Sequence, residues 1–133
     1  DYGARRVGLA LCDPAEIIVS PLRQLDVKNN DISALMGELR NIVAEHRVDA
    51  IVVGLPLNMD DTEGPQAQRT RQFARHLEKQ LALRVHLQDE RLSSLAADEM
   101  LDQAQVKGKK RRGKRDMLAA CDILQNFLDT AQR

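Results

Sequence analysis

Three acidic residues stand where an α/β protein would place catalytic groups. Asp1 opens an Asp-Tyr-Gly turn at what we interpret as the end of a strand, and Glu90 follows the short strand-like segment 84–87. Asp116 comes directly before an apolar pattern typical of a helix. Because functional side chains of open α/β sheets collect beyond the carboxyl ends of strands, we expect these three carboxylates to meet there.

Carboxylates grouped in this way suit divalent metal chemistry. Hard cations prefer oxygen ligands, and a few carboxylates leave coordination positions for water and phosphate. We therefore expect Asp1, Glu90 and Asp116 to be both the catalytic residues and the ligands of Mg²⁺ or Mn²⁺. Each residue also has an ordinary structural interpretation: Asp116 as a helix N-cap, Glu90 as a partner of the positive end of the next helix, and Asp1 as a turn residue.

A basic segment directly precedes Asp116. Residues 107–115 contain seven of the 20 lysines and arginines and no acidic residue, although the formal net charge of the 133-residue chain is zero. Positive charge concentrated in one stretch suits contact with a polyanion, and a solvated loop is the alternative. We expect this segment to be a loop whose basic side chains bind the nucleic-acid backbone, namely Lys109, Lys110, Arg111, Arg112 and Lys114.

The composition limits the kind of partner and the cell compartment that we expect for this chain. The chain has no tryptophan and three other aromatic residues, two of which, Phe73 and Phe127, fall on apolar helix faces. Few aromatic rings remain to stack on unpaired bases, which favours a structured nucleic acid recognised by its backbone. Cys12 and Cys121 show neither metal-ligand nor disulfide spacing, so we expect free thiols in a reducing cytoplasm. No apolar run is long enough for a membrane helix.

Hydrophobic patterning predicts a single α/β domain over residues 1–133. The predicted strands cover residues 6–12, 16–25, 49–55 and 84–87, and Pro21 marks an edge or a bulge in the second of them. The predicted helices cover residues 31–46 (capped by Asn30 or Asp31), 65–80, 93–105 and 117–128. Short turns between the first strands predict antiparallel pairing. The later alternation of strand and helix predicts a mixed sheet with helices on both faces.

Four segments resemble the YqgF/RuvX family, in the family's order and along nearly the whole chain. They are residues 1–8, residues 51–60 with Glu63-Gly64-Pro65, residues 89–94, and Asp116 with residues 119–120 and 123–125. The Gly-Leu-Pro-Leu-Asn run at 54–58 followed by Glu63-Gly64-Pro65 is a specific signal, and the Asp-Glu-Arg-Leu-Ser-Ser run at 89–94 strengthens it. The resemblance implies a ribonuclease H-like fold and places the family's acidic triad on Asp1, Glu90 and Asp116. The basic run before Asp116 also fits the family pattern.

The same resemblance implies a function. The family is described as a pre-16S rRNA nuclease that acts in 5′-end maturation, and thus in ribosome biogenesis, and also as a Holliday junction resolvase, which would be expected to work as a homodimer. A non-catalytic rRNA-binding assembly factor is a third alternative. The loop that holds Asn58, Asp60 and Glu63 is a family hallmark. Its polar residues either shape a strand-to-helix connection or contact the substrate.

Members of the family carry several more residues before the aspartate that corresponds to Asp1. We therefore expect this sequence to lack the start of the first strand of its domain. An amine at Asp1 would then stand beside the metal ligands, and its positive charge would weaken metal binding.

Overall fold

The computed structural model describes the backbone of residues 1–90 and 108–131, and side chains over 1–90 and 114–130. Its elements are β1 (Arg6–Cys12), β2 (Val19–Asp26), the 3₁₀ turn η1 (Lys28–Asn30), α1 (Ile32–His46), β3 (Ala50–Leu55), α2 (Pro65–Leu81), β4 (Arg84–Asp89) and α4 (Gly108–Ala131). The helix predicted over residues 93–105 lies outside the described residues. Within the described ranges, no helix is long and apolar enough to cross a membrane.

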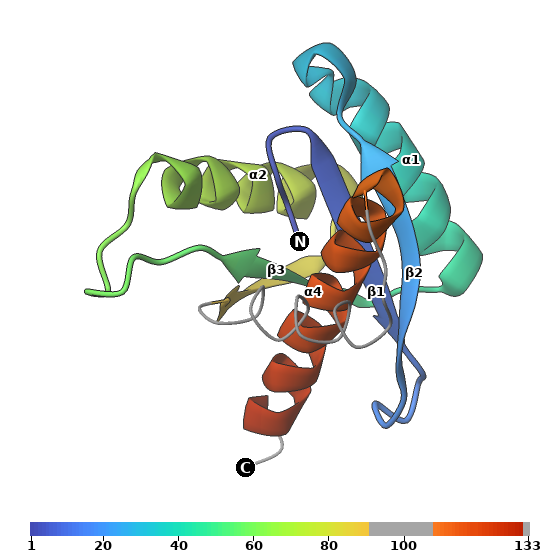
Figure 1. Ribbon diagram of the computed structural model, residues 1–133. Helices are drawn as coiled ribbons and strands as arrows, with labels where there is room; N and C mark the ends of the chain where they lie inside the picture. Colours follow the sequence, from blue (N-terminus) through green and yellow to red (C-terminus); the bar gives the residue numbers. More distant parts are fainter. Residues whose placement is uncertain (91–107, 132–133) are drawn as a thin grey trace.

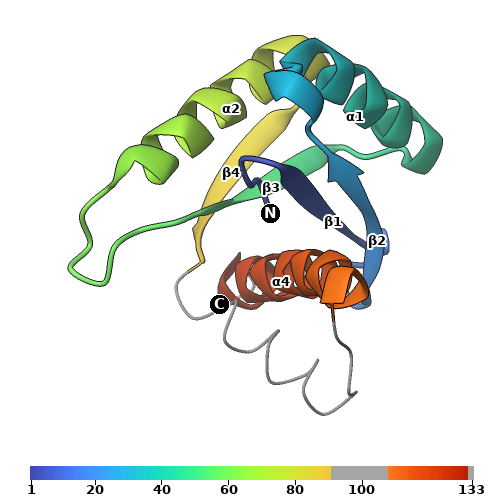
Figure 2. The same ribbon diagram turned by 45° about the horizontal axis from the view of Figure 1, so that its top comes forward.

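The strands lie between two helical layers. Helices α1 and α2 cover one side of the strands and α4 covers the other, as Figure 1 and Figure 2 show. A core cluster joins α1 and α2 to the strands through Leu35, Leu39, Val53, Phe73 and Leu77. The α/β class with helices on both sides is therefore confirmed.

The described strands form two separate sheets. Strand β1 pairs antiparallel with β2, and β3 pairs parallel with β4. The antiparallel pairing of the first strands is confirmed, but the single mixed sheet expected from the sequence is divided in two. Figure 2 shows β1 and β2 on one side of the chain start and β3 and β4 on the other.

Strand β2 begins later than predicted, and it contains the bulge that Pro21 predicted. It begins at Val19 because the preceding residues form a turn in which the Asp13 carboxylate accepts hydrogen bonds from the backbone of Ile17 and Ile18, each at 2.7 Å. Further along, Leu9 pairs with Arg23 whereas Ala10 pairs with Pro21. One extra residue of β2 is therefore bulged out beside the proline, where no N–H is available for the ladder.

Local signals in the sequence predicted the first two helices well. The Asp31 carboxylate accepts a hydrogen bond from the Ala34 N–H at 3.0 Å and caps α1, and Pro65 is the first residue of α2. Proline is favoured there because its missing N–H would have no partner within the helix.

Helix α4 begins nine residues earlier than the apolar pattern predicts. Residues 108–115, expected to form a loop, are its first turns. Lysine and arginine are good helix formers, and a single interior glycine, Gly113, costs only about 1 kcal/mol relative to alanine. The loop prediction was therefore wrong because the basic turns lack apolar periodicity while having ample helix propensity.

Candidate active site

Asp1 is held against the edge of β1 by backbone hydrogen bonds. Its amine donates to the Gly8 carbonyl at 2.8 Å, and the Gly8 N–H donates to the Asp1 carbonyl at 3.0 Å. A tight turn, in which the Gly3 N–H donates to the Arg6 carbonyl at 2.9 Å, connects the two segments. The position of Asp1 is thus fixed relative to β1 by main-chain geometry.

Glu90 lies at the end of the parallel sheet. Its N–H donates to the Leu55 carbonyl at 3.2 Å, which continues the β3–β4 pairing by one residue. The side chain folds over Gly54: a Cβ built on that glycine would lie 2.3 Å from Glu90 Oε2. Burial raises the pKa of Glu90, and this effect outweighs the nearby Asp1 amine, which lowers the pKa; the charge of Asp89 raises it further. The site therefore disfavours a charged carboxylate at Glu90 when no cation balances it.

Asp116 lies inside α4, and this corrects the interpretation of it as the residue that begins the final helix. Its backbone packs on β1 so closely that a Cβ built on Gly8 would lie 2.1 Å from the Asp116 carbonyl oxygen. The side chain is held by Arg6, whose Nε donates to Asp116 Oδ2 at 2.7 Å. Arg6 and Gly8 are two residues apart on one strand, so a single stretch of β1 supports Asp116 through both a side chain and a backbone contact.

The backbone of Asp1 lies within electrostatic reach of the other two acidic residues. Burial lowers the pKa of its amine to about 6, while the charges of Glu90 and Asp116 act in the opposite direction.

The three acidic residues suit a hard divalent cation in chemistry, since all offer carboxylate oxygens. Their side chains are not drawn together around one point: over residues 1–90 and 114–130, no group of three His, Cys, Asp or Glu side chains is arranged to hold a metal ion.

The predicted phosphate-binding residues lie on the helix that carries Asp116. Lys109, Lys110, Arg111 and Arg112 belong to the first turns of α4, and Lys114 is exposed two residues before Asp116. The basic segment and this acidic residue therefore share one rigid element, where the sequence suggested a loop followed by a helix.

The 58–63 loop uses its polar groups internally. Asn58 Nδ2 donates to the Thr62 hydroxyl at 3.0 Å, and the Asp60 carboxylate accepts from the Thr62 N–H at 3.1 Å and from its hydroxyl. Glu63 receives two bonds from Arg71 of α2, at 2.5 and 3.0 Å. These partners lower the pKa of both Asp60 and Glu63. The contacts favour a shaped strand-to-helix connection over a direct role in substrate binding.

We expect Thr62→Val to loosen this loop, because valine keeps the shape of threonine but loses the hydroxyl shared with Asn58 and Asp60. Amide hydrogen exchange at residues 58–63 should become faster, while the midpoint of thermal unfolding falls only slightly, on the order of 2 °C. Thr62→Ser is the matched control and should keep the slow exchange. Equal exchange rates in the valine and serine variants would contradict the internal role of the hydroxyl.

The Arg6–Asp116 ion pair predicts a measurable coupling. The two side chains are 34% and 19% exposed, so we expect a double-mutant cycle with Arg6→Gln and Asp116→Asn to give a coupling free energy of about 1 kcal/mol in unfolding experiments. Salt should reduce this value because part of the pair is in contact with solvent. A coupling energy of zero would show that Arg6 does not hold Asp116 in solution.

Comparison with known proteins places this arrangement in a family. The RuvX family, described as Holliday junction resolvase, matches residues 1–130. A protein of Lachnospira eligens named "Putative pre-16S rRNA nuclease" is 38% identical over 134 residues, which cover 100% of this chain and 96% of that protein. Proteins of the same name from Moorella thermoacetica and Cereibacter sphaeroides are 39% and 44% identical over 129 residues; each match covers 97% of this chain and 91% and 79% of those proteins. With the match extending over nearly its whole length, the chain belongs to the RuvX family.

Proposed function

We propose that the protein is a metal-dependent endonuclease that hydrolyses phosphodiester bonds in the 5′-end processing of pre-16S rRNA. The observation that carries this proposal is the position of Asp1, whose backbone lies within reach of the charges of both Glu90 and Asp116. The reciprocal pairing of Asp1 with Gly8, on which the backbone of Asp116 packs, supports a shared site for these acidic residues. The names of the relatives support the same activity.

In this proposal Asp1, Glu90 and Asp116 hold Mg²⁺ or Mn²⁺. Such ions, when bound, activate water for attack on phosphorus and stabilise the leaving oxygen. Arg6 orients the Asp116 carboxylate through Oδ2, and the other carboxylate oxygen would act as the metal ligand. The partly buried setting of Glu90 disfavours its charge in the absence of a cation, which strengthens its interaction with a cation that enters.

The first turns of α4 supply the contact with the substrate backbone. Lys109, Lys110, Arg111, Arg112 and Lys114 precede Asp116 on the same helix, so a phosphate chain that follows these side chains is led towards the acidic residues. Affinity for RNA should therefore fall steeply with salt concentration. The protein would work as one ribonuclease H-like domain over residues 1–133, in the cytoplasm where rRNA is processed.

A Holliday junction resolvase is the second candidate, and the description of the matched family favours it. Symmetric cleavage of a four-way junction would call for a homodimer. A non-catalytic assembly factor would use the basic turns of α4 alone.

A cleavage assay distinguishes these functions. The protein used is a chain extended before Asp1, so that no free amine stands beside the carboxylates. Its two substrates, tested in parallel, are a pre-16S rRNA 5′ leader and a four-way DNA junction. Each reaction is run with Mn²⁺ or Mg²⁺ and, for comparison, with a chelator. Asp116→Asn is compared with Asp129→Asn, an exposed aspartate further along α4. We expect metal-dependent cutting of the RNA that Asp116→Asn alone abolishes. Cutting of the junction alone would indicate the resolvase. If neither substrate is cut but both variants bind RNA equally, the nuclease proposal fails.

A further inference from the structure

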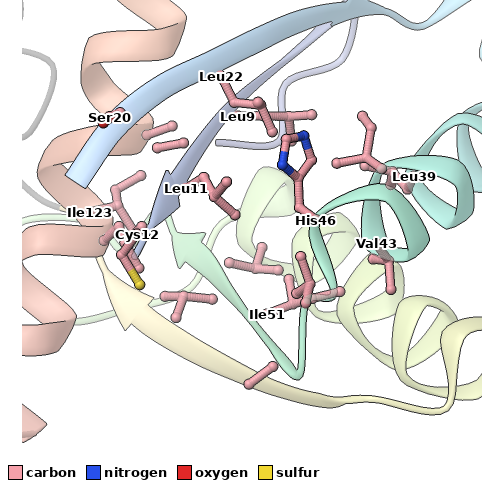
Figure 3. A pocket seen from close by; sticks show the side chains of 18 of the residues that line it. Leu9, Leu11, Cys12, Ser20, Leu22, Leu39, Val43, His46, Ile51 and Ile123 are labelled. Atoms are coloured by element: carbon pink, nitrogen blue, oxygen red, sulfur yellow. The ribbon is translucent and has the colours of Figure 1, made fainter. Parts of the chain in front are cut away.

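The large interior cavity does not suit a nucleic-acid backbone. It has a volume of about 620 Å³ and lies between the two sheets, and Figure 3 shows that mostly apolar side chains line it, among them Leu9, Leu11 and Ile51. Among the charged residues of its lining, acidic ones predominate: Asp1, Asp13, Glu16 and Asp49, against Arg47. Such a lining repels phosphates, so a polyanion has to bind on the outer surface.

The positive charge of the chain is concentrated in two segments. Residues 107–115 and α2 together carry 11 of the 20 lysines and arginines, but one of the 20 acidic residues. The rest of the chain therefore has a negative formal charge. Since a polyanion is attracted to places where positive charge predominates, α2 is a second element that suits it, besides the basic turns of α4.

Helix α2 carries basic residues on the face that points away from the strands. The residues of its buried face recur at helical spacing: Ala67, Thr70, Phe73, Ala74 and Leu77. Five exposed residues recur on the opposite face, and we call them the α2 stripe: Arg69, Gln72, Arg75, His76 and Lys79. The last four of these line one shallow depression of the surface, together with Glu78.

Within the described side chains, the cations of the α2 stripe are not neutralised by acidic residues. Arg69, Arg75 and Lys79 form no ion pair there, whereas Arg71, outside the stripe, is bound to Glu63. The guanidinium of Arg69 donates instead from Nε and Nη2 to Gln66 Oε1, at 3.1 and 2.9 Å. Because the amide of Gln66 is uncharged, it orients the guanidinium and leaves its full charge for a phosphate.

The α2 stripe begins beside the segment that carries Asp1. Gln66, which holds Arg69, also donates from Nε2 to the Tyr2 carbonyl at 3.3 Å. The Tyr2 ring stacks on Phe73, with ring centroids 3.9 Å apart. Arg69 is therefore linked through one side chain to the residue next to Asp1. From there the stripe continues along α2, while α4 lies on the other side of the strands (Figure 2).

We propose that the α2 stripe is a second contact with the RNA backbone, along which the substrate continues beyond the acidic residues. The inference rests on the proposed function, since it takes the same RNA as its ligand. RNA on one side of the bond to be cut lies on the basic turns of α4, and RNA on the other side lies along α2. The ten-residue span of the stripe is about 15 Å, which matches several successive phosphates of one strand.

Binding of a pre-16S rRNA 5′ leader, measured with chelator so that no cutting occurs, tests this contact. The stripe variant combines three substitutions: Arg69→Gln, Arg75→Gln and Lys79→Gln. The matched control removes three exposed charges from other surfaces: Arg23→Gln, Lys28→Gln and Arg84→Gln. Glutamine is a good helix former, so we expect α2 to keep its structure, which circular dichroism checks.

The stripe variant is expected to bind the RNA about tenfold more weakly, or worse, at about 0.15 M salt. The slope of log affinity against log salt concentration should also become shallower by about 2 to 3, close to one for each phosphate contact that is lost. The control variant should stay close to the unmodified chain in both quantities. Equal losses in the two variants would overturn the proposal, because overall charge would then explain them.

Shortening the RNA locates the contact. Leaders truncated from the 5′ end are compared with leaders truncated from the 3′ end, each with the unmodified chain, the stripe variant and Lys114→Gln. We expect one truncation to remove the effect of the stripe variant and the other to remove the effect of Lys114→Gln. If the same truncation removed both effects, the two basic surfaces would not bind RNA on opposite sides of the acidic residues, and the proposal would be wrong.

The remaining outcomes separate this inference from the proposed function. If Lys114→Gln weakens binding and the stripe variant does not, the α2 contact is refuted and the proposed function is untouched. If binding depends on the stripe but Mn²⁺ produces no cutting, the α2 contact stands and the nuclease proposal fails. A chain that binds no RNA would overturn both.

Discussion

Glu90→Gln is expected to reduce metal-dependent RNA cleavage by about 100-fold or more, with the fold retained. Glutamine matches glutamate in shape but removes the negative charge that lies over Gly54 at the end of the parallel sheet. The loss of a charged metal ligand removes several kcal/mol of transition-state stabilisation, and each 1.4 kcal/mol is about tenfold in rate. The measurement is the cleavage rate at saturating Mn²⁺ in single-turnover conditions.

The matched control for this variant is Glu78→Gln, which changes an exposed glutamate of α2. Its cleavage rate should equal that of the unmodified chain. Similar losses in the two variants would mean that overall charge, rather than the position of Glu90, determines the rate.

Glu90→Gln is expected to lower the cleavage rate but to raise the stability of the folded chain, because the pKa of Glu90 is raised in the fold. A carboxyl group whose pKa is higher in the folded than in the unfolded chain is penalised where it is charged. The penalty is absent below the ordinary value of 4.5, grows as the pH rises from there to the raised folded value, and is constant above it. We therefore expect Glu90→Gln, without metal, to unfold at a higher temperature than the unmodified chain at pH 8 and at nearly the same temperature at pH 4. A difference independent of pH would contradict this cause.

Gly8→Ala is expected to have the largest effect on stability. The new Cβ would lie 2.1 Å from the backbone carbonyl oxygen of Asp116, which cannot rotate aside as a side chain can. Helix α4 must shift as a whole, at a cost of about 3 kcal/mol, and the midpoint of thermal unfolding should fall by roughly 10 °C. Since the shift displaces Asp116, Mn²⁺ binding should weaken in the same variant.

Alanine substitutions at two other glycines serve as comparisons for Gly8→Ala. Gly37 lies within α1, where a Cβ added to it would meet no atom within 4 Å, so Gly37→Ala should stabilise the protein by about 0.5–1 kcal/mol. Gly54→Ala meets the ends of the Glu90 and Ile123 side chains, which can rotate, so its effect should fall on metal binding more than on stability. Gly8→Ala and Gly37→Ala variants of equal stability would rule out the close approach of α4 to β1.

Local signals in the sequence were sufficient for most individual elements. Some elements depend only on residues that are close together in the sequence. Examples are the strand at 6–12, the helix at 31–46 with its Asp31 cap, and the helix that begins at Pro65. Helix α4 was misjudged at its start because the basic turns carry no apolar periodicity, although their residues favour a helix.

The arrangement of these elements depends on contacts that no local pattern records. Arg6 and Asp116 are 110 residues apart, and nothing near either of them indicates their pairing. Gly8 and Gly54 resemble ordinary strand glycines until α4 and Glu90 are placed over them.

Mn²⁺ titration, followed by calorimetry or by the paramagnetic signal of the free ion, tests most directly whether Asp1, Glu90 and Asp116 form one metal site. The titration uses the chain extended before Asp1, as in the cleavage assay, together with its Glu90→Gln, Asp116→Asn and Glu78→Gln variants. We expect Glu90→Gln and Asp116→Asn each to weaken binding at least tenfold, and Glu78→Gln to leave it unchanged. Equal affinity in all four proteins would show that these acidic residues hold no metal together and would contradict the proposed nuclease site.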